Sequence, residues 1–157
     1  MRVGLVSAKV KPSIAIRQNR EQRYAFMSLL PVLLLIDDEF GVRESLKMVF
    51  SKDYRVLEAD SIDAAIPKVQ EAHPDVVLLD VLMPRVDGLE VLRRIKEIHP
   101  GCEVIMLTGV NSQQLAAKAM DSGAFDFIGK PFDVVDLRQK VSRALAQVAQ
   151  RSRSSSA

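Results

Sequence analysis

The chain has 157 residues, which suits one domain, and 48% of them are apolar, so a sizeable core can be buried. Its only cysteine, Cys102, excludes an internal disulfide and hence a disulfide-built secreted scaffold. We therefore expect a reducing, cytoplasmic setting. The longest apolar run, residues 29–36, is too short to span a bilayer, and no signal peptide is recognisable, so no membrane partner is expected.

The net charge of +2 is distributed unevenly along the chain. Residues 1–28 carry six basic and one acidic side chain, a net charge of +5, and the tail after residue 150 adds two arginines. The body between these ends therefore carries −5. A domain that binds nucleic acid through its fold would be basic instead, so we expect no direct nucleic-acid partner for this one.

Five short aliphatic and β-branched runs predict strands that are buried on both faces, as in a central parallel sheet. They cover residues 32–36, 54–57 (the weakest), 76–79, 104–107 and 125–128.

The segments between these runs repeat apolar residues three and four positions apart, which is typical of helices. Ser61 is expected to cap a helix over 62–72, which Pro67 should distort, and Asp133 to cap the last helix. Five strand–helix pairs in so short a chain predict an α/β fold, a doubly wound five-stranded parallel sheet with helices on both faces.

Polar side chains follow four of the five predicted strands. In chain order they are Asp37, Asp38, Glu39, Asp80, Thr108 and Lys130. Ligands of parallel α/β sheets bind at the carboxyl ends of the strands, so these groups should converge on one edge. Taken singly, each residue is an ordinary turn, cap or surface residue. Together, these carboxylates, a hydroxyl and an ammonium suit Mg²⁺ and phosphoryl transfer to an aspartate.

Four motifs carry a family resemblance. They are LLLIDDE at 33–39, VVLLDVLMPRVDG at 76–88, VIMLTG at 104–109 and FDFIGKPF at 125–132. In this order and spacing the chain resembles the receiver domain of two-component response regulators, including the single-domain chemotaxis type. The resemblance covers residues 31–148. It implies a flavodoxin-like (βα)5 fold with strand order 2-1-3-4-5.

The resemblance also assigns roles to residues. It implies that Asp80 is the phosphoacceptor and that Asp38 binds Mg²⁺ directly, while Asp37 assists through ordered water. The backbone carbonyl of Leu82 is expected to complete the metal's protein ligands. Lys130 is expected to pair with a phosphoryl oxygen, from a cis peptide bond to Pro131.

Two further roles concern switching and lifetime. Thr108 is expected to hydrogen-bond the phosphoryl group, and Phe127 to be the switch aromatic that swings inward when Thr108 moves. Leu82 and Val110 are apolar at places where polar residues of the family help to position the hydrolytic water. We therefore expect slow autodephosphorylation.

The resemblance implies a signalling protein rather than a classical enzyme. Its phosphoryl donor would be a sensor histidine kinase or a histidine phosphotransfer protein, docking near the first helix of the domain. Its output would be a separate downstream protein or an appended output domain, since the chain can be a fragment of a larger regulator. Whether phosphorylation drives homodimerisation is left open.

Two rival functions are weaker. A phosphohydrolase of the haloacid-dehalogenase type would carry an acidic residue two positions after its nucleophile, where this chain has Leu82. A degenerate receiver acting only as a binding module would not need its site residues intact, whereas this chain keeps Asp37, Asp38, Asp80, Thr108 and Lys130.

The sequence divides into three parts. Residues 1–28 predict a basic, disordered N-terminal extension, 29–148 the receiver domain, and 149–157 a Ser/Arg-rich tail or the start of a linker.

Overall fold

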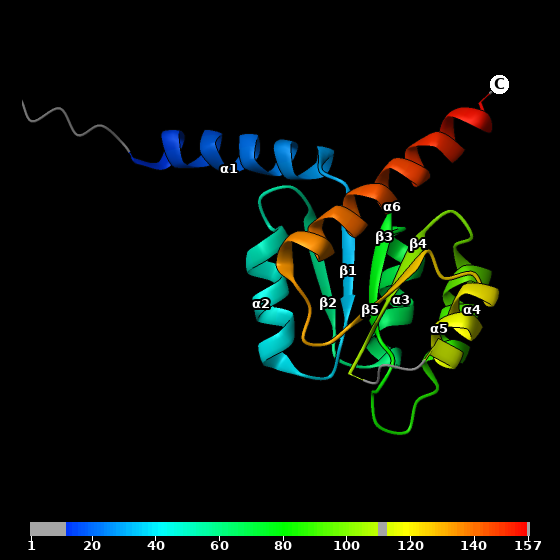
Figure 1. The fold of residues 1–157 in the computed structure, drawn as a ribbon. Coiled ribbons are helices and arrows are strands. Elements are labelled where there is room, and N and C mark those ends of the chain that lie inside the picture. The colour runs from blue at the N-terminus through cyan, green and yellow to red at the C-terminus, as the bar shows by residue number, and fades with distance from the viewer. Residues whose placement is uncertain (1–11, 110–112, 157) are drawn as a thin grey trace, which may run out of the picture. The chain divides into compact units, whose positions relative to one another are not determined.

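A computed structural model of the protein describes residues 12–109 and 113–156. The chain divides into two compact units, Met1–Leu30 and Pro31–Ala157. Helices and strands alternate along it (Figure 1). They are α1 (Pro12–Leu29), β1 (Val32–Ile36), α2 (Phe40–Phe50), β2 (Arg55–Ala59), α3 (Ile62–Ala72), β3 (Val76–Asp80), α4 (Gly88–Ile98), β4 (Glu103–Thr108), α5 (Gln113–Asp121), β5 (Asp126–Gly129) and α6 (Val134–Ser154).

The second unit is built on a parallel sheet in the order β2-β1-β3-β4-β5, as the resemblance implies. All residues of β3 and β4 are buried, which explains the continuous apolar runs at 76–79 and 104–107 within them. The predicted strand at 54–57 overlaps β2, which begins one residue later because Tyr54 ends the preceding turn. The other four strands lie within one or two residues of their predicted positions.

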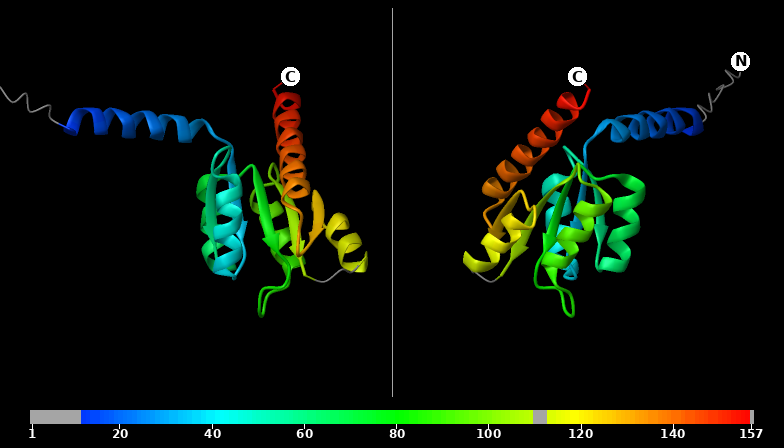
Figure 2. Two further views of the ribbon diagram at one scale, coloured as in Figure 1. Left: turned by 60° about the vertical axis from the view of Figure 1, so that its left-hand side comes forward. Right: turned by 90° about the vertical axis from the view of Figure 1, so that its right-hand side faces the viewer.

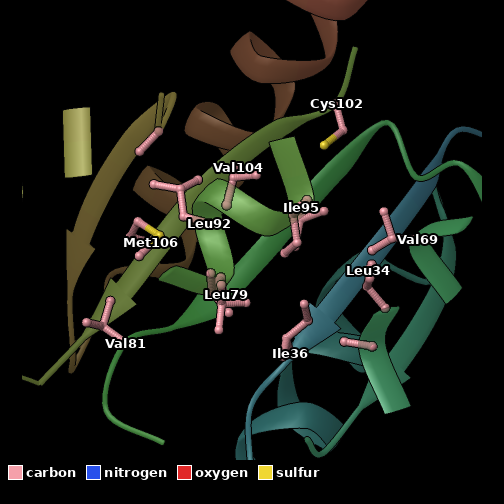
Figure 3. Close-up of a cluster of buried hydrophobic side chains, with 14 of the residues drawn as sticks. Leu34, Ile36, Val69, Leu79, Val81, Leu92, Ile95, Cys102, Val104 and Met106 are labelled. Atoms are coloured by element: carbon pink, nitrogen blue, oxygen red, sulfur yellow. The ribbon is translucent and has the colours of Figure 1, made fainter. Parts of the chain in front are cut away.

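Helices cover both faces of this sheet (Figures 1 and 2). Side chains alternate along each strand, so consecutive residues enter different cores. Leu34, Leu79 and Met106 pack with α3, α4 and α5 in one core, part of which is shown in Figure 3. Leu33 and Leu78 pack with α2 and α6 in the other. The two cores hold the central strands rigidly, and with them the loops at the strand ends.

The predicted helix caps are confirmed. The hydroxyl of Ser61 accepts a hydrogen bond from the backbone N–H of Ala64, and the carboxylate of Asp133 accepts one from Asp136 N–H. Helix α3 is continuous through Pro67.

The two ends of the chain differ from expectation. Residues 1–28 were predicted to be disordered. Residues 1–11 lie outside the described residues, and from Pro12 to Leu29 the chain forms the helix α1, within the first unit. Proline is favoured at the first position of a helix, and no glycine or second proline follows within this segment, so nothing interrupts it.

Residues 149–157 were predicted to be a Ser/Arg-rich tail or the start of a linker, but α6 continues through them to Ser154. Its serine hydroxyls donate to backbone carbonyls four residues earlier, as Ser152 does to Val148 and Ser154 to Gln150, so the polar composition does not end the helix. Arg151 also forms an ion pair with Glu103, which is buried at the start of β4.

None of the helices in the described ranges combines the length and the apolar character that crossing a lipid bilayer requires.

Replacing Leu34 with alanine should destabilise the second unit by about 2–5 kcal/mol, because the side chain is fully buried and its loss leaves a cavity. Met48→Ala is the matched control, since Met48 is 84% exposed on α2 and its truncation should change the free energy of unfolding by less than about 0.5 kcal/mol. Urea denaturation followed by circular dichroism measures both. Equal midpoints for the two variants would contradict this account of the core.

Candidate functional site

The carboxyl edge of the sheet brings the predicted polar residues together. Asp80 is the last residue of β3 and Thr108 the last of β4, and both side chains are buried. Asp37 directly follows β1 and is also buried, whereas the adjacent Asp38 is exposed. These neighbouring strands therefore place two buried carboxylates and a buried hydroxyl at one edge, with a third carboxylate facing solvent.

Lys130 reaches this cluster from the end of β5. Its ammonium nitrogen lies 2.7 Å from Oδ2 of Asp37 and 3.6 Å from Oδ1 of Asp80. Its backbone N–H donates to the carbonyl of Thr108, and the bond from Lys130 to Pro131 is cis, as predicted. A single cation thus joins two carboxylates that come from different strands.

The three aspartates present a set of oxygen ligands. One carboxylate oxygen from each of Asp37, Asp38 and Asp80 lies within 4.8 Å of the other two. Oxygen donors of this kind suit a hard divalent cation such as Mg²⁺, which also relieves the repulsion between the carboxylates. The residues present therefore fit the metal that the sequence predicts.

The cluster shifts the acidity of its members in a consistent way. Burial raises the pKa of Asp80, and the charges of Asp37 and Asp38 raise it further, against the lowering effects of the Leu82 N–H and Lys130. Burial by itself would lower the pKa of Lys130, but the hydrogen bond and charge of Asp37, with the charges of Asp80 and Glu39, raise it overall. Lys130 therefore keeps its positive charge. The neighbouring Asp80 carboxylate carries its negative charge at a cost, which binding of a proton or a metal cation would relieve.

Leu82 lies two residues after Asp80, at the solvent-exposed side of the site. Its backbone N–H donates to Oδ1 of Asp80 at 3.2 Å, and the residue is 52% exposed. This hydrogen bond orients the carboxylate through the same oxygen that Lys130 approaches. Metal binding by the Leu82 carbonyl stays a prediction, and Val110 lies outside the described residues.

Phe127 lies on β5, opposite Met106 of β4. Its partly buried side chain packs against the core formed with α3, α4 and α5. The aromatic ring is therefore anchored on the strand next to the one that ends in Thr108. Its inward movement on phosphorylation stays a prediction.

Sequence reasoning missed one residue of this edge. Arg43, on the first turn of α2, donates from Nη1 to the backbone carbonyl of Asp37 at 2.7 Å. The sequence shows only an arginine five positions after Asp38. That spacing alone does not distinguish Arg43 from an ordinary surface arginine.

The chain belongs to the response regulator receiver domain family, whose model matches residues 33–142. The known function of this family is to accept a phosphoryl group in two-component signalling, a signalling role rather than that of a classical enzyme.

Individual relatives agree. Over 114 residues the chain is 34% identical to the sporulation initiation phosphotransferase F of Bacillus subtilis (strain 168), covering 72% of this chain and 92% of that protein. It is 34% identical to the regulatory protein AtoC of Escherichia coli (strain K12), covering 76% of this chain but only 26% of that longer protein. The crystal structure of a response regulator receiver domain protein from Clostridium thermocellum superposes with a TM-score of 0.71, at 35% identity and over 75% of this chain and 96% of that one.

Asp80→Asn should raise the free energy of unfolding of the metal-free protein at neutral pH, because it removes a buried negative charge next to two others. The raised pKa of Asp80 means that this carboxyl stabilises the fold at low pH and that its contribution is lost as the pH rises through the folded-state pKa. Asparagine removes the unfavourable charge, so the gain should shrink as the pH falls below that pKa.

Urea denaturation in EDTA measures this effect, with Asp60→Asn as the control because Asp60 is exposed. A neutral-pH midpoint for Asp80→Asn equal to or below that of the wild type would refute the electrostatic account.

Proposed function

We propose that Asp80 is the phosphoacceptor of this receiver domain, taking a phosphoryl group from a phosphohistidine donor with the help of Mg²⁺. The observation that carries the proposal is the position of Lys130, whose ammonium lies 2.7 Å from Asp37 and 3.6 Å from Asp80. This arrangement leaves a buried carboxylate of raised pKa beside a cation and within a set of metal-ligating oxygens. Family membership supports the same role.

In the reaction, one carboxylate oxygen of Asp80 forms a bond to phosphorus while the phosphorus–nitrogen bond of the phosphohistidine breaks. The N–H of Leu82 holds Oδ1 of Asp80, so the attacking group is already oriented. Lys130 exchanges its contact with Asp80 for a phosphoryl oxygen, and Thr108 donates its hydroxyl to another. Bound Mg²⁺, held by Asp38, the Leu82 carbonyl and Asp80, with Asp37 acting through water, would offset the negative charge of the carboxylates and the phosphoryl group.

Phosphorylation then changes the output surface. The new charge draws Thr108 toward the site, and Phe127 on the neighbouring strand moves into the space that this opens. A sensor histidine kinase or histidine phosphotransfer protein supplies the phosphoryl group, docking near α2. A separate output protein or an appended domain reads the changed surface, and a phosphorylation-dependent homodimer is an alternative reader. We place this activity in the cytoplasm, where such donors act.

The first test is incubation with acetyl phosphate or phosphoramidate, with and without Mg²⁺, followed by intact-mass spectrometry. We expect a Mg²⁺-dependent gain of one phosphoryl group in the wild type and none in Asp80→Asn. Urea denaturation of Asp80→Asn shows whether the variant is folded. No gain in the wild type would refute the phosphoacceptor role and favour a binding module that works without phosphorylation.

A second test concerns the lifetime of the phosphorylated state. We expect slow autodephosphorylation, because the half-exposed Leu82 beside Asp80 offers no polar side-chain group to position a hydrolytic water. Leu82→Asn should shorten the half-life of phospho-Asp80 several-fold, and Met48→Asn, at an exposed position on α2, should leave it unchanged. Decay after removal of the donor is followed by intact mass. An unaltered lifetime in Leu82→Asn would contradict the assignment.

A further inference from the structure

The backbone of Asp37 is held on both sides, at its N–H and at its carbonyl. The N–H of Asp37 donates to the carbonyl of Ala59 at 3.1 Å, which continues the pairing of β1 with β2. The carbonyl of Asp37 accepts from Nη1 of Arg43 at 2.7 Å. The first of these bonds belongs to the sheet, whereas the second depends on a single side chain.

Arg43 is itself fixed in place. Its side chain is only 12% exposed, and its Nε lies 3.7 Å from the carboxylate of Glu58 on β2. Its guanidinium also lies 5.8 Å from the centre of the Phe40 ring. The arginine therefore bridges the loop after β1 and the neighbouring edge strand, and little conformational freedom is lost when it binds the Asp37 carbonyl.

Asp38 depends on this bridge more than the other two aspartates do. The carboxylate of Asp37 is held by Lys130 and by the N–H of Glu39, and that of Asp80 by Leu82 N–H. Within the described part of the chain, no side-chain hydrogen bond or ion pair orients Asp38. Its position is set by the peptide that precedes it, and the orientation of that peptide is set by Arg43.

We infer that Arg43 is a positioning residue for cation binding: through the Asp37 carbonyl it holds the Asp38 carboxylate where it can share one Mg²⁺ with Asp80. This inference rests on the proposed function and adds to it a residue that does not touch the metal or the phosphoryl group.

The sign of the effect distinguishes positioning from simple electrostatics. A guanidinium near the site repels Mg²⁺, so if charge were its only influence, removing Arg43 would tighten Mg²⁺ binding. If positioning dominates, removing it weakens binding, as is usual when groups that orient metal ligands are lost. The two effects therefore predict opposite changes in the same measurement.

The experiment is isothermal titration of Mg²⁺ into the wild type, Arg43→Gln, Arg43→Lys and Lys47→Gln. We expect Arg43→Gln to weaken Mg²⁺ binding, raising the Kd by about tenfold. Lys47→Gln is the matched control, because Lys47 lies on the same helix and pairs with the same Glu58 but has no contact with Asp37. Lys47→Gln should leave the Kd for Mg²⁺ unchanged or slightly lower it. Arg43→Lys keeps the charge without the planar fork and should fall between wild type and Arg43→Gln.

A kinetic readout separates positioning from general loss of structure. With acetyl phosphate, Arg43→Gln should need a higher Mg²⁺ concentration for half-maximal phosphorylation, while the rate at saturating Mg²⁺ stays close to that of the wild type. Urea denaturation in EDTA shows whether the variant is folded, and if Arg43→Gln does not fold, the comparison of Arg43→Lys with wild type decides.

The outcomes separate the two proposals. A wild type that binds no Mg²⁺ overturns the proposed function and this inference with it. A wild type that binds Mg²⁺, with Arg43→Gln (or Arg43→Lys, if only that variant folds) binding as tightly or more tightly, overturns the inference and leaves the proposed function standing.

Discussion

The site depends on one electrostatic constraint, which is that buried carboxylates from two strands share a single ammonium group. Asp37 and Asp80 are both buried, and Lys130 contacts both. One positive charge does not balance this cluster once Asp38 is included, so the folded protein retains an excess of negative charge at the carboxyl edge of the sheet. That imbalance raises the pKa of Asp80 and creates an affinity for cations. Under the proposed function, an anionic phosphoryl group would need further positive charge to accompany it there.

The rest of the second unit keeps these charges together. Asp80 and Thr108 end strands whose every residue is buried, and the cores on the two faces of the sheet prevent those strands from separating. Asp37 and Lys130 follow the strands on either side of this central pair. The energy needed to hold like charges close is therefore supplied by aliphatic packing distant from the charges themselves.

Much of this could be predicted from the sequence, because periodicity and strand-end chemistry are local signals. The continuous apolar runs identify the buried strands, and Ser61 and Asp133 mark helix starts with their own side chains. Arg43 could not be predicted, because its role depends on where α2 places a guanidinium relative to a backbone carbonyl. The ends of the chain were misjudged for a related reason: composition suggested disorder, but helix continuity depends on the lack of breaking residues and, for α6, on a partner distant in sequence.

The ion pair between Arg151 and Glu103 bears on where this domain can be cut. Glu103 begins the same strand that Thr108 ends, and its carboxylate is buried. A truncation after residue 148, the boundary suggested by the family resemblance, would remove the cationic partner of that carboxylate and leave its charge uncompensated. A boundary drawn there therefore cuts through α6 and separates Glu103 from a partner one helical turn further along, so the residues beyond it belong to the fold rather than to a tail.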